Sequence, residues 1–531
     1  MATHELSPYM LLVLLLALPV VVLVVLARRH AHGRDDARSQ LRPPPGPWAM
    51  PVIGHLHHLA GVAPPHRALR DLARTYGPLM ALRLRNVPVV VASSPDAARE
   101  VTRTHDVALA SRPLAPALRL LHRGAEGVTF APYGDGWRQM RRVCTLELFA
   151  APRVRSFRAV REDELARLLG AVATAGARAA PVNLTRWISR FLFDSAARAI
   201  TGGSRSEHRD EFLRMLQEAL RRLPKFSLLD FFPPSRLATL ASYVSSHVIV
   251  RRRAAMRSIG PDLDAILDSI IREHLERRDD AAATGVQDDD DKDLLDVLLR
   301  LQKDMDFQYP LTTINIKSVI MDLFVAGGET SSTALQWAMI ELMRNPAVMQ
   351  KAQDEVRTAL AGQSKVTEDG LTNLHYLRLV IKETLRLYPP APVLLRECRN
   401  ACQVLGYHVP QGAMVLVNAW AIGRDPAHWD APEEFVPERF EHCGRDFRGA
   451  DFEYIPFGAG RRICPGMGLG LAHVELALAA LLFHFDWELP EGMVAEEMDM
   501  TEAAGITMPP RSDLVLVANP RMPVRANRLN K

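Results

Sequence analysis

The chain has 531 residues, of which 48% are hydrophobic and 24% are charged, so it is long enough to bury a large core. Its 65 basic and 61 acidic residues give a formal net charge of +4, which does not point to a nucleic-acid partner, since such a partner would call for a clustered basic face. The five cysteines are irregularly spaced and include no Cys-x-x-Cys pair, which argues against a disulfide framework and against zinc. A reducing, cytosol-facing environment fits them better.

An unbroken apolar run from Met10 to Ala27 is the first strong signal. As a helix of about 1.5 Å per residue it would reach roughly 27 Å, close to the hydrocarbon thickness of a thin bilayer. A cleaved signal peptide is the alternative, but no Lys or Arg precedes the run and no small-residue cleavage site is evident after it. Arg28, Arg29 and Arg34 follow the run and predict a cytosolic body. We therefore expect an uncleaved membrane anchor over residues 1–29.

The segment after the anchor, residues 30–52, is charged and rich in proline, which predicts an extended, stiff hinge. Residues 79–94 have the pattern of two short strands around an Asn-Val-Pro turn. From about residue 95 to residue 362 most segments show helical spacing, and we interpret the acidic run 279–292 as a surface loop. Short strand-like runs return near residues 394–402, 404–409, 414–418 and 514–518. The predicted fold class is mainly α with small peripheral β-sheets, in one catalytic domain over residues 53–531.

The stretch PFGAGRRICPG, residues 456–466, places Cys464 in a loop with three glycines. A thiolate can bind a metal when backbone N–H groups of such a loop, or a helix N-terminus, stabilise its charge. Helical spacing resumes after Cys464, so we expect the sulfur just ahead of a helix. Arg462 adds a cation, and an iron porphyrin offers both a metal for the sulfur and carboxylates for arginines. The plainer alternative is a buried thiol near a turn.

The spacing Phe457-x-x-Gly460-x-Arg462-x-Cys464-x-Gly466 resembles the haem-binding signature of the cytochrome P-450 superfamily, with every position filled. The resemblance implies the cytochrome P-450 fold enclosing haem b, which is iron protoporphyrin IX. It further implies that Cys464 is the metal ligand and that Phe457 and Arg462 bind the cofactor.

A second motif is Glu383-x-x-Arg386, followed by Arg439 in the sequence PERF. The spacing alone carries little weight, because Glu100 and Arg103 share it and such pairs are common on helix surfaces. In their order along the chain and their distance from Cys464, however, the three residues resemble the family's buried Glu-Arg-Arg triad. A buried network must be fully satisfied, so the implied role is structural rather than catalytic.

The stretch AGGETS, residues 326–331, lies inside a long helical segment expected over residues 313–344. Gly327 and Gly328 each weaken a helix interior by roughly 1 kcal/mol relative to Ala. One interpretation is a tolerated kink in which Thr330 bonds back along the helix. The resemblance implies instead an oxygen-binding groove, where the glycines make room for dioxygen and the catalytic pair Glu329 and Thr330 relays protons.

Trp137 and Arg141 are four residues apart and share a helix face. By resemblance they contact a haem propionate, and Arg396, after the Glu-x-x-Arg helix, contacts another. We interpret three other arginines as solvated surface residues: Arg138, Arg142 and Arg461.

The motifs together resemble the large plant microsomal group of the superfamily. This implies a monooxygenase on the endoplasmic reticulum membrane that inserts one atom of O2 into a lipophilic small molecule. Electrons would come from a separate NADPH–cytochrome reductase, with cytochrome b5 as an optional second partner, since the chain shows no flavin or dinucleotide-binding unit of its own. Two alternatives are an O2-independent haem isomerase or dehydratase, and a haem sensor or electron carrier. A carrier usually needs a second strong iron ligand, which AGGET does not offer.

The expected substrate pocket is mostly small or apolar and suits a lipophilic ligand. We favour a terpenoid, with a phenylpropanoid, an indole or an amino-acid-derived compound as alternatives. By family likeness the lining includes Phe324, Ala326, Ala391, Val393, Leu394 and the turn Ile506–Thr507, with further residues from 123–127 and 228–232.

Overall fold

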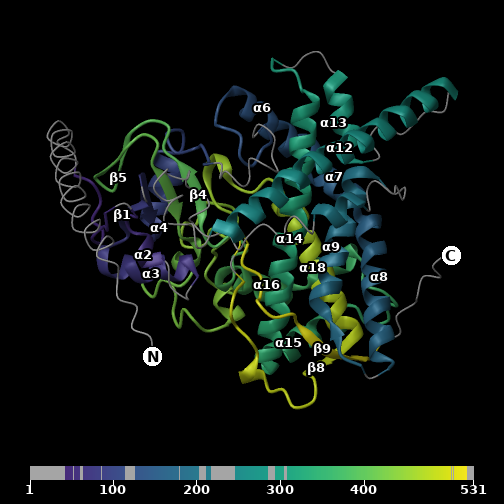
Figure 1. Ribbon diagram of the computed structural model, residues 1–531. Coiled ribbons are helices and arrows are strands. Elements are labelled where there is room, and N and C mark those ends of the chain that lie inside the picture. Colours follow the sequence, from purple (N-terminus) through teal and green to yellow (C-terminus); the bar gives the residue numbers. More distant parts are fainter. Residues whose placement is uncertain are drawn as a thin grey trace, which may run out of the picture.

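The computed structural model describes residues 42–51, 53–59, 64–84, 86–113, 126–178, 180–202, 211–216, 246–284, 293–303, 308–503, 505 and 507–522. The expected membrane anchor, the first part of the hinge, the 228–232 segment and Ile506 lie outside these residues. The described fold is mainly helical with three small sheets, as predicted. Figure 1 shows the helices gathered around α14 and the largest sheet set to one side of them.

The centre of the helical part is α14 (Thr313–Arg344), which packs against α9 (Leu184–Thr201) and α18 (Met467–His484). A capping box between Thr312 and Asn315 fixes the start of α14. Most of its later residues are buried on all sides, which is the pattern of a helix enclosed by neighbours. The other longer helices are α3 (Pro65–Tyr76), α6 (Asp135–Val143), α8 (Arg158–Gly176), α12 (Ser246–Thr284), α13 (Leu294–Lys303), α15 (Pro346–Ala359) and α16 (His375–Leu387).

The strands confirm the runs expected from the sequence. The largest sheet has the order β1 (Leu79–Leu84), β2 (Val87–Ala92), β7 (Met414–Val417) and β4 (Leu394–Glu397), with only the β2–β7 pair parallel. A hairpin joins β5 (Cys402–Val404) to β6 (Tyr407–Val409). The third sheet has the order β3 (Val182–Asn183), β9 (Val515–Pro520) and β8 (Phe485–Glu488).

The acidic surface loop predicted over residues 279–292 is wrong in its first part, because α12 continues to Thr284. The run DDAAAT at this end contains three alanines, the strongest helix formers, and the two like charges, Asp279 and Asp280, are exposed to solvent. Residues 285–292 lie outside the described part of the chain.

The described part of the hinge, residues 42–51, lies along the sheets of the body. The backbone N–H of Ala81 donates to Pro45 O at 2.7 Å, and that of His408 donates to Arg42 O at 2.9 Å. The prolines therefore hold an extended path that two backbone hydrogen bonds attach to the catalytic domain.

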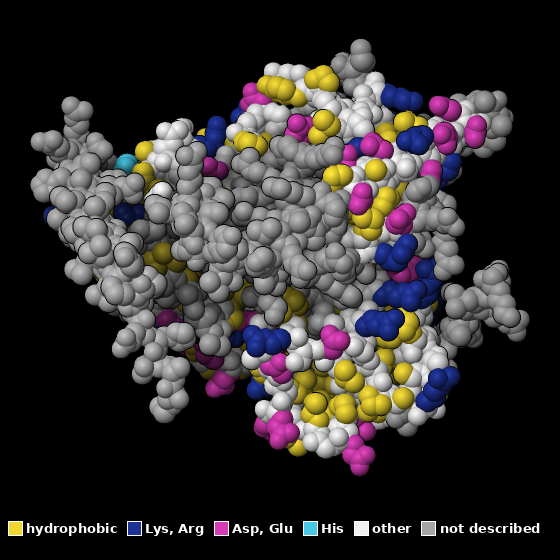
Figure 2. All heavy atoms as spheres, in the orientation of Figure 1, with side chains coloured by type: hydrophobic (Ala, Val, Ile, Leu, Met, Phe, Trp, Pro, Cys, Tyr) yellow, Lys and Arg dark blue, Asp and Glu magenta, His cyan; other side chains and the backbone are white. Residues whose placement is uncertain are grey.

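Among the described helices, only α18 is long and apolar enough to cross a membrane by composition. Most of it is buried inside the protein, and its N-terminal end carries the Cys464 loop, so it is a core helix. On the face drawn in Figure 2, the described acidic and basic side chains lie among one another around a large area of residues that are not described.

Candidate active site

The loop ahead of α18 presents the sulfur of Cys464 as the sequence predicts. The backbone N–H of Cys464 donates to Phe457 O at 2.9 Å and closes the loop. Gly460 has φ +67°, and a Cβ there would lie 1.9 Å from Thr102 O, so only glycine fits. Gly466 caps α18, and its backbone N–H also hydrogen-bonds to the sulfur. The thiol therefore lies at the N-terminal end of a buried helix.

Burial raises the pKa of the Cys464 thiol, whereas the N–H of Gly466 and the charges of Arg141 and Arg112 act to lower it. The loop thus supplies an N–H donor to the partly buried sulfur, and Arg141 and Arg112 add two nearby cations. A metal ion bound there would deprotonate the thiol outright.

Four guanidinium groups gather beside this loop: Arg112, Arg141, Arg396 and Arg462. Burial and the charges of the other three lower the pKa of Arg462 to about 8. Burial and Arg112 likewise lower the pKa of Arg396 to about 9, against a smaller opposing effect of Asp106. The Nε of Arg396 is buried and has no hydrogen-bond partner among the described residues. Arg396 and Arg462 are buried and Arg112 and Arg141 are partly buried, and this excess of positive charge calls for anionic groups from a ligand.

Arg462 and Trp137 are tied to the same loop, residues 128–131. Arg462 donates to Ala110 O at 2.6 Å, to Val128 O at 3.1 Å and to Ala131 O at 2.5 Å. Its guanidinium lies over the Trp137 ring at 4.1 Å, and Trp137 Nε1 donates to Val128 O at 2.9 Å. In this structure both side chains direct their hydrogen bonds to backbone carbonyls, whereas Arg141 has no such acceptor among the described residues.

Sequence reasoning missed two residues that shape this region. Arg112 donates to Thr129 O at 3.3 Å and to Arg462 O at 3.2 Å, and it lies near enough to affect Cys464. Asp322 on α14 accepts the backbone N–H groups of Val128 and Thr129 at 2.8 and 2.9 Å. No local motif marks either residue, since each matters only through partners far away in the sequence.

The AGGETS segment lies inside the continuous helix α14. Thr330 Oγ1 donates to Ala326 O at 2.7 Å, so the back-bonded arrangement expected as one alternative is present. Ala326 is exposed and Gly327 partly exposed, although the helix is buried on both sides of them. This local exposure, in the middle of a core helix, marks space for a ligand next to Thr330.

The two glycines have different surroundings. A Cβ on Gly327 would meet nothing within 4 Å among the described residues, whereas a Cβ on Gly328 would lie 2.9 Å from the ring of Phe193 on α9. Of the two, only Gly327 therefore has the open surroundings expected of an oxygen groove. Gly328 allows α14 and α9 to pack closely.

This difference predicts opposite effects on stability. We expect Gly327→Ala to stabilise the protein by about 0.5–1 kcal/mol through helix propensity and to lower turnover, because its methyl fills ligand space. We expect Gly328→Ala to destabilise it by about 1–3 kcal/mol through crowding of Phe193. Urea unfolding of both haem-loaded variants measures the contrast, and changes of the same sign would contradict it.

The Glu-Arg-Arg residues form the buried network implied by the resemblance. Arg386 donates to both carboxylate oxygens of Glu383 at 2.8 Å, and Arg439 Nε donates to Oε1 at 2.9 Å. Arg386 also donates to backbone carbonyls, including Pro432 O at 2.7 Å and Glu434 O at 2.9 Å. The triad therefore fastens α16 to the segment before the Cys464 loop.

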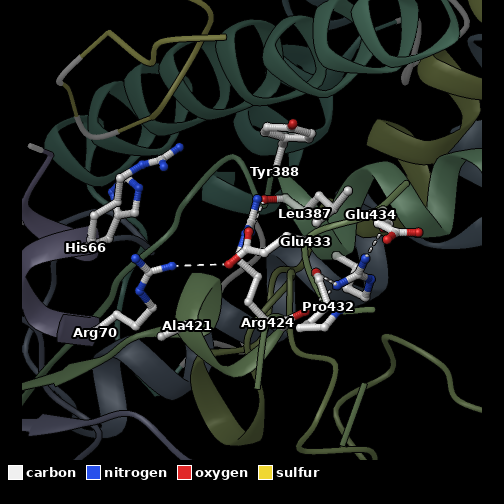
Figure 3. Close-up of polar contacts among 12 residues, drawn as sticks. His66, Arg70, Leu387, Tyr388, Ala421, Arg424, Pro432, Glu433 and Glu434 are labelled. Atoms are coloured by element: carbon white, nitrogen blue, oxygen red, sulfur yellow. Dashed lines mark hydrogen bonds and ion pairs between the residues drawn. The ribbon is translucent and has the colours of Figure 1, made fainter. Parts of the chain in front are cut away.

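A second buried arginine supports the same segment. Figure 3 shows Arg424 between Glu433 and Leu387, with Arg70 reaching Glu433 from the other side. Arg424 Nε donates to Glu433 at 2.9 Å, and burial lowers its pKa to about 10.

The expected pocket residues divide into two groups. Phe324 is fully buried against Phe212, with ring centroids 4.8 Å apart, and so packs the core. Ala326 is exposed, and Val393 and Leu394 are partly exposed, as a pocket lining requires. Thr507 is 5% exposed.

The described residues contain one further group of possible metal ligands, His274, Asp293 and Asp296. His274 Nε2 lies 3.1 Å from Asp293, and Asp293 accepts the backbone N–H of Asp296 at 2.9 Å in the first turn of α13. We assign this group a structural role, joining α12 to α13.

The residues near Cys464 fit a haem. They combine three features: a thiol at a helix N-terminus, a cluster of four guanidinium groups that outnumber the nearby carboxylates and leave Arg396 Nε unsatisfied, and open surroundings along Ala326 and Gly327. Iron, propionates and a distal ligand space are the corresponding parts of a haem site.

Comparison with known proteins gives the same answer over nearly the whole chain. The cytochrome P-450 family model matches residues 43–517. Desmethyl-deoxy-podophyllotoxin synthase of Sinopodophyllum hexandrum is 44% identical over 502 residues, covering 94% of this chain and 95% of that protein. Premnaspirodiene oxygenase of Hyoscyamus muticus is 45% identical over 483 residues, covering 91% and 93%. A zebra fish cytochrome P-450 solved with progesterone shares the fold, with a TM-score of 0.72 at 23% identity over 86% of this chain and 100% of that chain.

These matches define the class of the protein, which is an oxidoreductase whose haem iron takes a cysteine thiolate as ligand. The chain belongs to the cytochrome P-450 family. It is a monooxygenase that uses O2 and electrons derived from NADPH, which confirms the reaction class expected from the sequence.

Proposed function

We propose that this monooxygenase inserts one oxygen atom into a terpenoid hydrocarbon in plant specialised metabolism. The observation that carries the proposal is the near full-length likeness to premnaspirodiene oxygenase, whose name specifies a diene. The partly exposed apolar side chains of Val393 and Leu394, which we expect to line the pocket, suit such a substrate. Desmethyl-deoxy-podophyllotoxin synthase, at 44% identity, makes a different substrate class the second candidate.

In this proposal Cys464 ligates the haem iron, and Trp137, Arg141, Arg396, Phe457 and Arg462 hold the cofactor. When bound, haem supplies the activation of O2. Burial raises the pKa of Glu329, so its carboxyl keeps a proton to higher pH than an exposed glutamate. The Glu329 carboxyl delivers this proton, and the Thr330 hydroxyl lies next to the exposed Ala326–Gly327 face where it is needed. Glu383, Arg386 and Arg439 act only through the scaffold.

We further propose a single-pass protein of the endoplasmic reticulum membrane, with residues 1–29 as the anchor, 30–52 as the hinge and 53–531 as the cytosolic catalytic domain. A membrane-bound NADPH–cytochrome reductase is its electron donor, and cytochrome b5 is an optional second one. The apolar run before Arg28 and the attachment of residues 42–51 to the body support this arrangement.

Two alternatives from other classes, an O2-independent haem enzyme and an electron carrier, are less well supported than a monooxygenase. An O2-independent isomerase or dehydratase has no need of a proton relay, yet this chain has Glu329 and Thr330 beside the ligand space. An electron carrier would need a strong second iron ligand, and residues 326–330 contain no His, Met or Lys.

Replacing Thr330 with alanine tests the proton relay. We expect product formation to fall about 100-fold, the lower range for loss of a positioned proton-transfer group, with NADPH electrons diverted to hydrogen peroxide. Thr330→Ser keeps the hydroxyl and is the matched control. Product per NADPH and released peroxide are measured together, and unchanged coupled turnover in the alanine variant would refute the role.

A substrate panel tests the proposed function itself. Membranes containing this chain and a plant reductase are first checked for an intact thiolate–haem spectrum with CO. They then receive NADPH and sesquiterpene and diterpene hydrocarbons, and product masses are recorded. A product heavier by one oxygen, absent without NADPH, is the expected result. If no hydrocarbon is converted by spectrally intact enzyme, the terpenoid proposal fails, and phenylpropanoid, indole and amino-acid-derived substrates come next.

A further inference from the structure

The carboxyl of Glu329 is held by a loop from the far end of the chain. Thr507 Oγ1 donates to Glu329 Oε1 at 2.5 Å, although the two residues are 178 positions apart. Among the described residues, Thr507 is the only polar partner of this carboxyl, and no Arg, Lys or His is among the groups that affect it. The carboxyl of Glu329, the acid of the AGGETS motif, thus depends on one hydroxyl group for its hydrogen bonding.

Thr507 is itself held firmly against α14. The next residue, Met508, accepts a hydrogen bond from Trp337 Nε1 at 2.9 Å and donates its N–H to Pro390 O at 3.2 Å. The Trp337 ring stacks on Tyr388 with centroids 4.1 Å apart and an interplanar angle of 7°. The backbone beside Thr507 is therefore fixed to the same helix that carries Glu329.

The two carboxyl oxygens of Glu329 have different surroundings. Oε1 is bonded to Thr507, whereas Oε2 has no hydrogen-bond partner among the described residues, so when Thr507 donates to Oε1 the proton of a protonated Glu329 lies on Oε2. Thr330 donates to Ala326 O instead, so the two neighbouring side chains of the motif are not bonded to each other. Among the described residues, the carboxyl of Glu329 therefore has no side-chain hydrogen bond within α14.

We propose that Thr507 is a positioning residue for proton delivery, holding Oε1 of Glu329 so that the proton on Oε2 faces the reaction space. The inference rests on the proposed role of Glu329. The contact between Thr507 and Glu329 links the substrate-pocket loop to the proton relay, so a change in the loop alters the position of the Glu329 carboxyl.

The direction of the pH effect follows from the contacts. Burial raises the pKa of Glu329, and the Thr507 hydrogen bond acts against that rise. Removing the hydroxyl should therefore raise the pKa further and keep the carboxyl protonated to higher pH. The alkaline limb of the pH–rate profile should move by about one pH unit to higher pH.

The test compares Thr507→Val, which keeps the shape but removes the donor, with Thr507→Ser, which keeps the donor. Thr501→Val is a matched control in the same C-terminal region, because Thr501 Oγ1 donates to the exposed carboxylate of Asp499 at 2.5 Å. All variants must first show an intact thiolate–haem spectrum with CO. Peroxide released per NADPH, the pH profile and the infrared carboxyl band of the resting holoenzyme are then measured, and the band is assigned by its loss in Glu329→Gln.

We expect Thr507→Val to increase the uncoupled fraction several-fold and to shift the Glu329 band and the alkaline limb, whereas the Ser and Thr501 variants behave as the parent. In a Glu329→Gln background, Thr507→Val should add nothing. An unshifted band, or an equal effect of Val in both backgrounds, would overturn the proposal. The band and the peroxide release do not depend on a terpenoid product, so failure of the substrate panel leaves this test intact.

Discussion

Cys464→Ala is expected to abolish both the thiolate–haem spectrum with CO and all monooxygenase activity. Among the described cysteines, Cys464 alone combines a glycine-rich loop, the N–H of Gly466 and the two cations Arg112 and Arg141. Alanine removes the one atom that can donate electron density to the iron from this side. The effect should be complete rather than graded.

The spectrum of purified holoprotein provides the measurement. Cys443→Ala is the matched control, because Cys443 is exposed and lies outside the motif loop of residues 456–466, and it should leave the spectrum unchanged. A thiolate spectrum retained by Cys464→Ala would contradict the assignment of the ligand and of the whole site.

Glu383→Gln should destabilise the protein by about 3–5 kcal/mol, which is more than the loss expected for Gly328→Ala in α14. The carboxylate of Glu383 is fully buried and accepts hydrogen bonds from Arg386, Arg439 and the backbone N–H of Val436. An amide cannot accept from all of them, and it leaves two guanidinium groups without a counter-charge. The expected result is an inactive, haem-poor protein.

Urea unfolding followed by circular dichroism, with the haem content of the purified protein, measures this loss. Glu100→Gln is a sharp control, because Glu100 has the same spacing to Arg103 but is partly exposed, and its loss should cost within about 1 kcal/mol. Equal losses in the two variants would show that spacing alone, without burial, determines the effect.

The sequence predicted those features that depend on local order along the chain. The Cys464 loop, the helix after it, the two strands of residues 79–94 and the bounds of α14 follow from glycine spacing and hydrophobic period, and the structure has them. The different roles of Gly327 and Gly328 could not be predicted, because they depend on which residue of α9 faces each glycine. Arg112, Asp322 and the Thr507–Glu329 contact were missed for the same reason, since each joins segments more than 150 residues apart.

The excess of positive charge from the arginines near the motif loop affects how much of the protein accumulates in a cell. A newly made chain that has not met its cofactor must hold four guanidinium groups together with only Asp106 and Asp322 as nearby carboxylates, so its folded form is less stable than that of the haem-loaded chain. Cofactor binding adds the missing negative charge and pulls the equilibrium toward the folded form. Chains that are synthesised faster than porphyrin is supplied would be degraded. The yield of the protein in a foreign host should therefore follow the supply of porphyrin precursors more closely than the strength of the promoter.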